Sequence, residues 1–311
     1  MVILPKGTFD LPWCYGLMAM FGVFALSLFM VRPAWAEAPS VFVESELTVG
    51  YDDNLSQAER ERDTIEDHFA EGKLGLLYNH KINFHAAASV KGFLSGIAYE
   101  TAKNMSRGSA GVEASVRYQP EFGFLSPFYR FTVTAQIDEY ESDQRDSDLI
   151  KAQLVATKRM TDQMTASLGT EYRYRNSDGS VWDTDDWRFF LNGDLMLTKQ
   201  LAFYSTYSFL KGDVTSSAQV VFCNGVVADD IYGLIQSSTE LETDEALSED
   251  FCGEWVAYRL DATTNAIITG FNYGFGRSWS LDASMLWASV NGEGDNDYYR
   301  RIYRLSVLAR F

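Results

Sequence analysis

The sequence predicts an all-β protein, an antiparallel transmembrane β-barrel of about twelve strands. Three observations carry this prediction. The chain ends in Phe311, which closes a segment whose side chains alternate between apolar and mostly polar. Similar alternating segments recur along residues 41–311, and the connections between them are short and long in turn. The chain also begins with an apolar leader of the kind that directs export.

Residues 1–36 have the features of a cleavable signal peptide. Residues 17–31 are mostly apolar, and this run is too short to cross a membrane comfortably as a helix. The segment Ala34-Trp35-Ala36 follows, and small residues in this spacing are typical of a cleavage site. We therefore expect cleavage after Ala36 and a mature chain, residues 37–311, that forms one β-barrel domain. An uncleaved membrane anchor is the alternative.

Period-two alternation identifies the strands, because a barrel strand directs alternate side chains to lipid and to the lumen. Twelve segments show it, and an even number is what bacterial single-chain barrels require. These segments lie at about residues 41–51, 74–78, 82–90, 112–118, 129–137, 150–156, 164–174, 187–197, 201–209, 256–270, 278–290 and 299–311.

The connections between these segments alternate between two kinds. Short ones lie near residues 79–81, 119–126, 161–162, 199–200 and 274–277, and long ones at about 52–67, 95–107, 141–148, 176–186, 213–254 and 291–297. This asymmetry predicts short periplasmic turns, long extracellular loops and both termini in the periplasm. A soluble β-sandwich, the alternative, would need a covered apolar face and would not sort its loops in this way.

The pattern resembles the Gram-negative outer-membrane β-barrel class, including its porins, over about residues 40–311. Phe311 and its alternating strand match the C-terminal signal that the barrel-assembly machinery reads in that class. The resemblance implies this machinery as a partner and contact with outer-membrane lipid and lipopolysaccharide. Residues 47–55, Leu-Thr-Val-Gly-Tyr-Asp-Asp-Asn-Leu, are also similar to the first barrel strand of surface lipoprotein assembly modifiers and related uncharacterised proteobacterial barrels. That likeness covers one short strand, so it implies the class and not the activity.

The charge is strongly acidic and lies mainly in the predicted outer loops. The formal net charge is −17, and removing Lys6, Asp10 and Arg32 with the leader leaves −18. Such a chain is a poor partner for nucleic acid, which is bound by Lys and Arg. Residues 212–258 contain ten acids and neither Lys nor Arg. Solvated loops are one interpretation, and divalent-cation bridging to lipopolysaccharide or to a surface partner is the other. No stretch has the spacing of a metal site, so none is predicted.

The inward faces of the predicted strands lean basic instead. We expect the lumen to be lined by Lys91, Arg117, Arg130, Lys151, Arg173, Arg188, Arg259 and Arg304, with Arg130, Arg173, Arg188 and Arg259 near mid-strand. Four further inward basic residues are expected at Lys73, Arg175, Arg300 and Arg310. Fewer acids share these faces, namely Glu44, Glu46, Glu113, Asp138, Glu171, Asp194, Asp261 and Asp282.

Rings of Arg and Lys favour anions, so the leading hypothesis is a narrow passive channel, or porin, for small anionic solutes. The alternative is a structural or assembly barrel that salt bridges close and whose acidic loops bind a surface partner. The sequence leaves the oligomeric state open.

An outer-membrane lipid hydrolase is a second alternative. Such an enzyme needs a serine activated by a histidine, and His85 with Ser89 on one predicted strand face is the available pair. A histidine beside a serine is more often part of a polar lumen, so we expect no enzyme. No cofactor-binding motif occurs, and no cofactor is predicted.

Two cysteines remain after the leader, Cys223 and Cys252, both within the longest predicted loop. An exported chain passes through an oxidising compartment, so we expect a disulfide between them. Two free thiols or a metal pair would be the alternative, and no histidine lies nearby to complete a metal site.

The mature protein should begin at Glu37 and should fractionate with the outer membrane. N-terminal sequencing of the purified membrane protein checks the first expectation, and fractionation checks the second. A mature chain that starts before Glu37, or that sediments with the inner membrane, would contradict the signal-peptide assignment.

Overall fold

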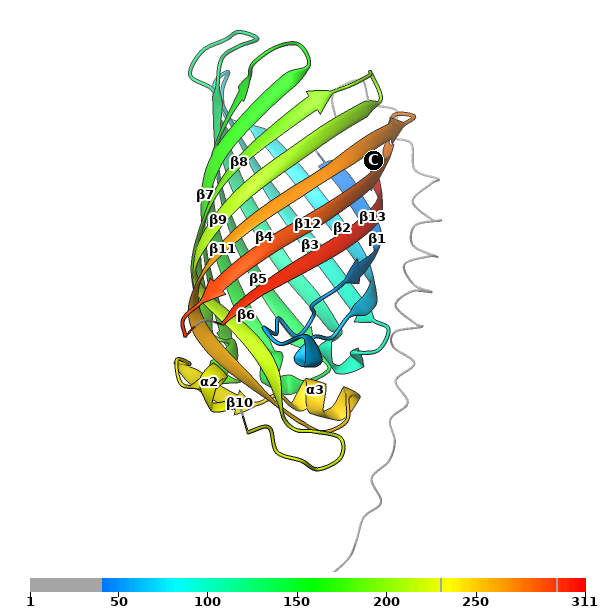
Figure 1. Ribbon diagram of the computed structural model, residues 1–311. Coiled ribbons are helices and arrows are strands. Elements are labelled where there is room, and N and C mark those ends of the chain that lie inside the picture. Colours follow the sequence, from blue (N-terminus) through cyan, green and yellow to red (C-terminus); the bar gives the residue numbers. More distant parts are fainter. Residues whose placement is uncertain (1–40, 230, 295) are drawn as a thin grey trace, which may run out of the picture. The chain divides into compact units, whose positions relative to one another are not determined.

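Antiparallel strands closed on themselves form the body of the molecule (Figure 1). The computed structural model describes residues 41–229, 231–294 and 296–311, and the predicted signal peptide lies outside them. Within these residues each strand pairs with the next along the chain, except that β9 (Leu201–Val221) pairs with β11 (Glu254–Phe275) instead. The last strand, β13 (Asp297–Arg310), pairs with the first, β1 (Val41–Asp52). The prediction of an all-β barrel with twelve strands is therefore confirmed.

The barrel strands are β1 (Val41–Asp52), β2 (Asp67–Lys81), β3 (Ala86–Tyr99), β4 (Arg107–Tyr118), β5 (Phe128–Tyr140), β6 (Ser147–Arg159), β7 (Met164–Ser177), β8 (Thr184–Met196), β9 (Leu201–Val221), β11 (Glu254–Phe275), β12 (Trp279–Gly292) and β13 (Asp297–Arg310). The short β10 (Glu240–Thr243) pairs with β11 beyond the barrel. The connections contain two short helices, α2 (Ile231–Ile235) and α3 (Glu245–Asp250), and the 3-10 turns η2 (Glu61–Asp63), η3 (Lys103–Met105), η4 (Asp143–Arg145) and η5 (Ser180–Trp182).

The two terminal strands close the barrel. Nine residue pairs join β1 to β13, from Glu44 with Arg310 to Asp52 with Ile302. Phe311 extends this seam, because its N–H and its carbonyl both bond to the backbone of Val43 at 2.9 Å. Its ring meets Trp279 edge-on at 5.6 Å. The last residue thus contributes directly to barrel closure.

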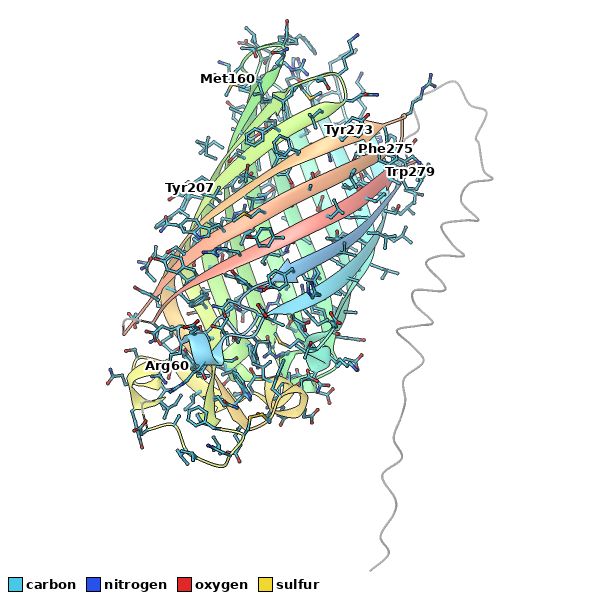
Figure 2. The ribbon with its side chains drawn as sticks, turned by 45° about the vertical axis from the view of Figure 1, so that its right-hand side comes forward. Arg60, Met160, Tyr207, Tyr273, Phe275 and Trp279 are labelled. Carbon is cyan, nitrogen blue, oxygen red and sulfur yellow. A yellow bond between two sulfur atoms is a disulfide. The ribbon has the colours of Figure 1, made fainter. Side chains whose placement is uncertain are left out.

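The outward side chains form an apolar surface that no second layer covers within the described residues. Leu47, Leu94, Ile137 and Leu168 lie on four different strands, and each is more than half exposed. Figure 2 shows Tyr207, Tyr273, Phe275 and Trp279 pointing away from the barrel. Large exposed apolar side chains at every second position suit contact with lipid and exclude a sandwich. No helix among the described residues is long and apolar enough to span a membrane.

The two ends of the barrel differ, as the sequence predicts. We call the end with connections 82–85, 119–127, 160–163, 197–200 and 276–278 the turn end. The loop end holds connections 53–66, 100–106, 141–146, 178–183, 222–253 and 293–296. The predicted long loops are shorter than expected because the strands extend further, and the connection at 293–296 is itself short.

The predicted loop 213–254 is wrong over residues 213–221, which are strand, whereas β11 begins at Glu254, close to the predicted start at residue 256. Residues 213–221 and 254–259 continue β9 and β11 as a paired ribbon beyond the other strands, with Val221 opposite Glu254. Ala218 and Tyr258 from the ribbon pack with Ile231 of α2 in a buried apolar cluster. This packing stabilises the strand over residues 213–221, whose sequence shows only a weak apolar pattern because it includes Thr215, Ser216, Ser217 and Gln219.

Aromatic rings of neighbouring strands cover several inward-facing glycines. Phe190 of β8 lies over Gly169 of β7, and a Cβ at Gly169 would stand 2.3 Å from the ring's Cζ and 3.0 Å from the Leu154 carbonyl. Phe69 over Gly50 and Phe93 over Gly111 repeat the arrangement. Since no real Cβ tolerates such a contact, the glycine lets the ring lie flat against the barrel wall.

Gly169→Ala should lower barrel stability by about 1–3 kcal/mol, because the added methyl displaces the Phe190 ring. Gly193→Ala is the matched control, since nothing lies within 4 Å of a Cβ there. Heat-modifiable mobility measured against temperature compares the two variants. Equal midpoints for both would show that the ring and the glycine are not tightly packed.

Candidate functional site: the barrel lumen

The lumen is open to solvent at the turn end and covered at the loop end. Inward side chains near the turn end are exposed, with Arg310 at 52% and with Arg117 and Arg130 also exposed. Inward residues near the loop end are buried, with Asp52 at 1% and Asp138 at 0%. This gradient means that the connections at the loop end lie over the barrel mouth.

We call connections 53–66, 100–106, 141–146, 178–183 and 222–253 together the cap (Figure 1, lower end). Three of these connections, 53–66, 100–106 and 222–253, share a buried apolar cluster to which β11 adds Trp255. The other members of the cluster are Leu55, Ile65, Ala102, Met105, Ala246 and Leu247. Polar contacts add to this packing. Asp250 accepts a 2.7 Å hydrogen bond from the Asn104 backbone, and burial raises the pKa of the Asp250 carboxyl. The cap is therefore a packed structure and not a set of independent loops.

A buried ion pair joins the cap's largest segment to a neighbouring loop. Arg145 of η4 donates from Nη2 to both carboxylate oxygens of Asp244, at 2.9 and 2.8 Å. Ser217 of β9 donates to the same carboxylate at 2.6 Å, and the Arg145 guanidinium lies 3.7 Å from the centre of the Trp182 ring. Asp244 also caps α3 by accepting from the Leu247 N–H. One carboxylate thus holds segments that are far apart in sequence.

The expected cysteine pair is present. Cys223 and Cys252 form a disulfide, with Cα atoms 5.1 Å apart. It lies just beyond the paired ends of β9 and β11 and ties the base of the 222–253 connection. The disulfide therefore restrains the cap segment and leaves the barrel strands to their own hydrogen bonds.

Seven of the eight predicted lining residues face inward in the observed register. They are Lys91, Arg117, Arg130, Lys151, Arg173, Arg188 and Arg304. They do not all lie together. Lys91 pairs with Glu44 at 3.5 Å near the turn end, and Arg117 and Arg130 are cross-strand partners there. The expectation of a mid-strand Arg130 is therefore wrong, because β5 begins at Phe128 on that end.

Arg259 is not in the lumen, and its prediction is wrong. It lies on the extension of β11 beyond the barrel, where its Nη1 donates to the carbonyls of Ser180 at 3.0 Å and Asp183 at 2.5 Å. Asp261 shares its face of β11. Alternation assigned Arg259 to the lumen because Tyr258 and Leu260 resemble lipid-facing residues, whereas both are buried against the cap.

The lumen also holds acids that the sequence analysis missed. Asp52 pairs with Arg300, and Asp186 pairs with Arg173 at 2.8 Å. Asp67 accepts hydrogen bonds from the backbone N–H groups of Thr101 and Ala102. These residues were assigned to loops, because the strands extend further than their apolar pattern shows. Among the described residues, the loop-end half of the lumen therefore carries no basic excess.

A basic excess remains at mid-barrel, on adjacent strands. Lys151 of β6 is the cross-strand partner of Arg173 on β7, and Arg188 on β8 is the partner of Glu171. Glu171 lies 4.0 Å from both arginines, and Arg188 also donates to Ser208 at 2.9 Å. Lys151 has no carboxylate oxygen within 4.0 Å among the described residues.

Arg304 of β13 lies across the lumen from Lys151, since β6 and β13 are half the barrel apart. Partners of Lys151 traced one way around the barrel lead to the loop end of β12, and those traced the other way lead to the turn end of β1. The point on β13 that lies at the same height along the barrel axis as Lys151 is therefore midway along β13, at about Arg304. The two traces are Arg173, Asp186, Gly212, Ala262 and Gly292, and Thr134, Glu113, Lys91, Leu77 and Phe42.

We call Lys151, Arg173, Arg188 and Arg304 the basic belt. Arg304, like Lys151, has no carboxylate within salt-bridge distance in the described part of the chain. The three other belt residues are partly exposed to the lumen, with Arg173 at 37% and Arg188 at 25% of the side chain. The belt can therefore meet a solute that enters from the turn end.

The residues named for a hydrolase are separated by other contacts. His85 lies in the turn before β3, where its Nδ1 is 2.9 Å from the Gln119 carbonyl and its ring packs on Phe122. Ser89 shares a hydrogen bond with Ser115 at 2.7 Å. A histidine poised to take a proton from Ser89 is not assembled in this arrangement.

The fold matches known outer-membrane barrels. The COG4313 outer membrane channel from Pseudomonas putida F1 is similar with a TM-score of 0.55 and 12% identity, over 90% of this chain and 100% of that one. The KdgM porin in complex with disordered oligogalacturonate (TM-score 0.39, 11% identity, 85% of this chain, 99% of that one) and the NanC porin (0.40, 11%, 85%, 98%) are more distant. No protein-family model matches the sequence, and no curated protein matches it. Its fold is therefore that of the β-barrels of the Gram-negative outer membrane.

Asp244→Asn should loosen the cap without unfolding the barrel. Removing one partner of a buried ion pair costs about 3–5 kcal/mol, because the other charge is left buried and unpaired. We expect faster hydrogen exchange and protease cleavage in residues 141–146 and 244–250, with unchanged heat-modifiable mobility. Glu245→Gln, at the exposed neighbouring position, should leave both as in the wild type. Loss of barrel mobility in Asp244→Asn would show that the cap is required for barrel assembly.

Proposed function

We propose that this protein is a narrow outer-membrane channel for small anionic solutes, with its loop end outside the cell and its termini in the periplasm. The observation that carries the proposal is the basic belt. Four cations line the middle of the lumen, three on the adjacent strands β6, β7 and β8 and one opposite them on β13, and the nearest acids, Asp186, Glu171 and Glu71, are fewer. A ring of Arg and Lys in a pore favours anions.

The acidic surface does not oppose this selectivity at the belt. At physiological salt a charge is screened over about 8 Å, so distant loop carboxylates act weakly on a solute inside the barrel. Several acids of the loop end are also engaged, since Asp244 pairs with Arg145 and Asp52 with Arg300. In a narrow bore of low dielectric, the electrostatic energy of a solute depends most on the nearest fixed charges, and these are the belt cations.

The proposed channel is gated by the cap. It covers the loop end, so a solute passes only when the cap moves away. The Arg145–Asp244 pair is the contact whose loss should favour the open state. We expect low conductance from the wild type and higher conductance from Asp244→Asn.

A structural or assembly barrel remains the second candidate. The ion pairs of the loop-end lumen favour it, because they fill the bore as a closed network would. The cap also exposes Val226, Val227 and Tyr232 on its surface, where a partner could bind. The absence of conductance in both the wild type and Asp244→Asn would support this candidate and overturn the channel.

Reversal potentials in a KCl gradient test the selectivity. Channels formed by Asp244→Asn should favour chloride, and adding Lys151→Gln and Arg304→Gln should remove most of that preference. Arg117→Gln and Arg130→Gln, which lie at the exposed turn end, are the matched control and should change it little. Cation selectivity, or an anion preference that the belt substitutions leave unaltered, would contradict the proposal.

A further inference from the structure

The belt is interrupted by an apolar strip on the inner wall. Ile268 of β11 and Leu286 of β12 are cross-strand partners and face the lumen. Ala266 and Ala288, the next inward pair, continue the strip. Leu210 of β9 adds an apolar side chain on the neighbouring strand, opposite Thr264. Apolar residues are unusual on the inward face of a water-filled barrel, where polar residues are the rule.

Two belt arginines flank this strip. Arg188 is the cross-strand partner of Leu210. On the other side Arg304 is the partner of Ser284, the inward residue that follows Leu286 on β12 toward the turn end. The Arg188 guanidinium also lies 4.9 Å from the centre of the Phe190 ring. The apolar surface therefore lies between two cations, within one side chain's reach of each.

The strip differs from the apolar packing nearer the cap. Val290 is buried at the loop end, where it packs with Tyr298, and Ile302, the cross-strand partner of Leu286 on β13, is buried beside the strip. Ile268, Leu286 and Leu210 are only half-buried. Packing against Tyr298 explains the burial of Val290, whereas Ile268, Leu286 and Leu210 keep exposed surface that a solute in the lumen can contact.

We propose that the belt and the strip together bind organic acids with an apolar body, such as an aromatic carboxylate. This inference rests on the proposed channel function and names its solute class. The carboxylate would pair with Arg304 or Arg188, and the apolar body would cover Ile268 and Leu286. A polar anion of the same charge gains only the first contact, so the site discriminates by the apolar area that it removes from water.

Saturation-transfer NMR on the full-length barrel in nanodiscs tests this, because the lumen is open at the turn end and binding needs no open cap. Benzoate, gluconate and benzyl alcohol are the probes. Benzoate should bind about three- to tenfold more tightly than gluconate, as its buried ring area predicts. It should also bind more tightly than benzyl alcohol, which lacks the charge.

Leu286→Ser and Ile268→Thr should each reduce benzoate binding to about the gluconate level and leave gluconate binding unchanged. Both variants should fold, because serine already occupies the adjoining inward positions Ser284 and Ser208. Ile97→Thr, an inward isoleucine on β3, is the matched control and should have no effect. Arg304→Gln should weaken both anions.

The outcomes separate the two proposals. Equal binding of benzoate and gluconate, or benzoate binding that both strip variants leave unchanged, overturns the apolar subsite while the anion channel stands. No binding of either anion, or anion binding indifferent to Arg304→Gln, overturns the anion-binding lumen itself, and the subsite with it.

Discussion

Every backbone N–H and C=O within a bilayer must be paired inside the protein, and the rest of this structure depends on that constraint. A sheet meets it only by closing, so the first and last strands must find each other after the whole chain has formed. Val43 and Phe311 complete this seam with reciprocal hydrogen bonds. An aromatic C-terminal residue is therefore also part of the wall, besides matching an assembly signal.

Closure separates the molecule into two surfaces with different solvents. The outward surface carries the apolar side chains, so the usual arrangement of an apolar core is reversed over most of the barrel. The inward surface gathers Arg, Lys, Asp and Glu in a confined space, where each charge needs a partner or water. Near the loop end the partners are other side chains, as in Asp138 with Arg175 at 3.1 Å. Near mid-barrel the charged side chains have fewer such partners, so their charges are available to a solute in the lumen.

The cap contributes to two of the three buried apolar clusters among the described residues, and it does so with loops. Its order depends on one long connection that contacts four others. The ion pair of Arg145 and Asp244 fixes where that connection lies. A buried pair contributes little net stability but disfavours other arrangements strongly, since either charge left alone is costly. Such a contact defines one closed position, which is what a gate requires.

The sequence by itself determined the strands, their outward faces, the two kinds of ends and seven of the eight predicted lumen cations. These features follow from alternation, which is local, because a one-residue slip would turn a charge such as Arg188 into lipid. It also indicated the cysteine pair by compartment. Strand ends were less accurate, since polar residues such as Asp52 and Asp186 continue a strand without an apolar signal.

Only the tertiary structure decided which residues meet. Arg259 bonds to two carbonyls in another loop, and Arg145 finds Asp244 ninety-nine positions along the chain. The height of each cation along the barrel axis also depends on strand tilt and on register around the whole barrel. Lys151 and Arg304 therefore lie at the same height on opposite sides of the lumen, whereas Arg130 lies at the mouth of the barrel. Alternation assigns a side chain to a face, but the closed sheet alone sets its height and its companions on that face.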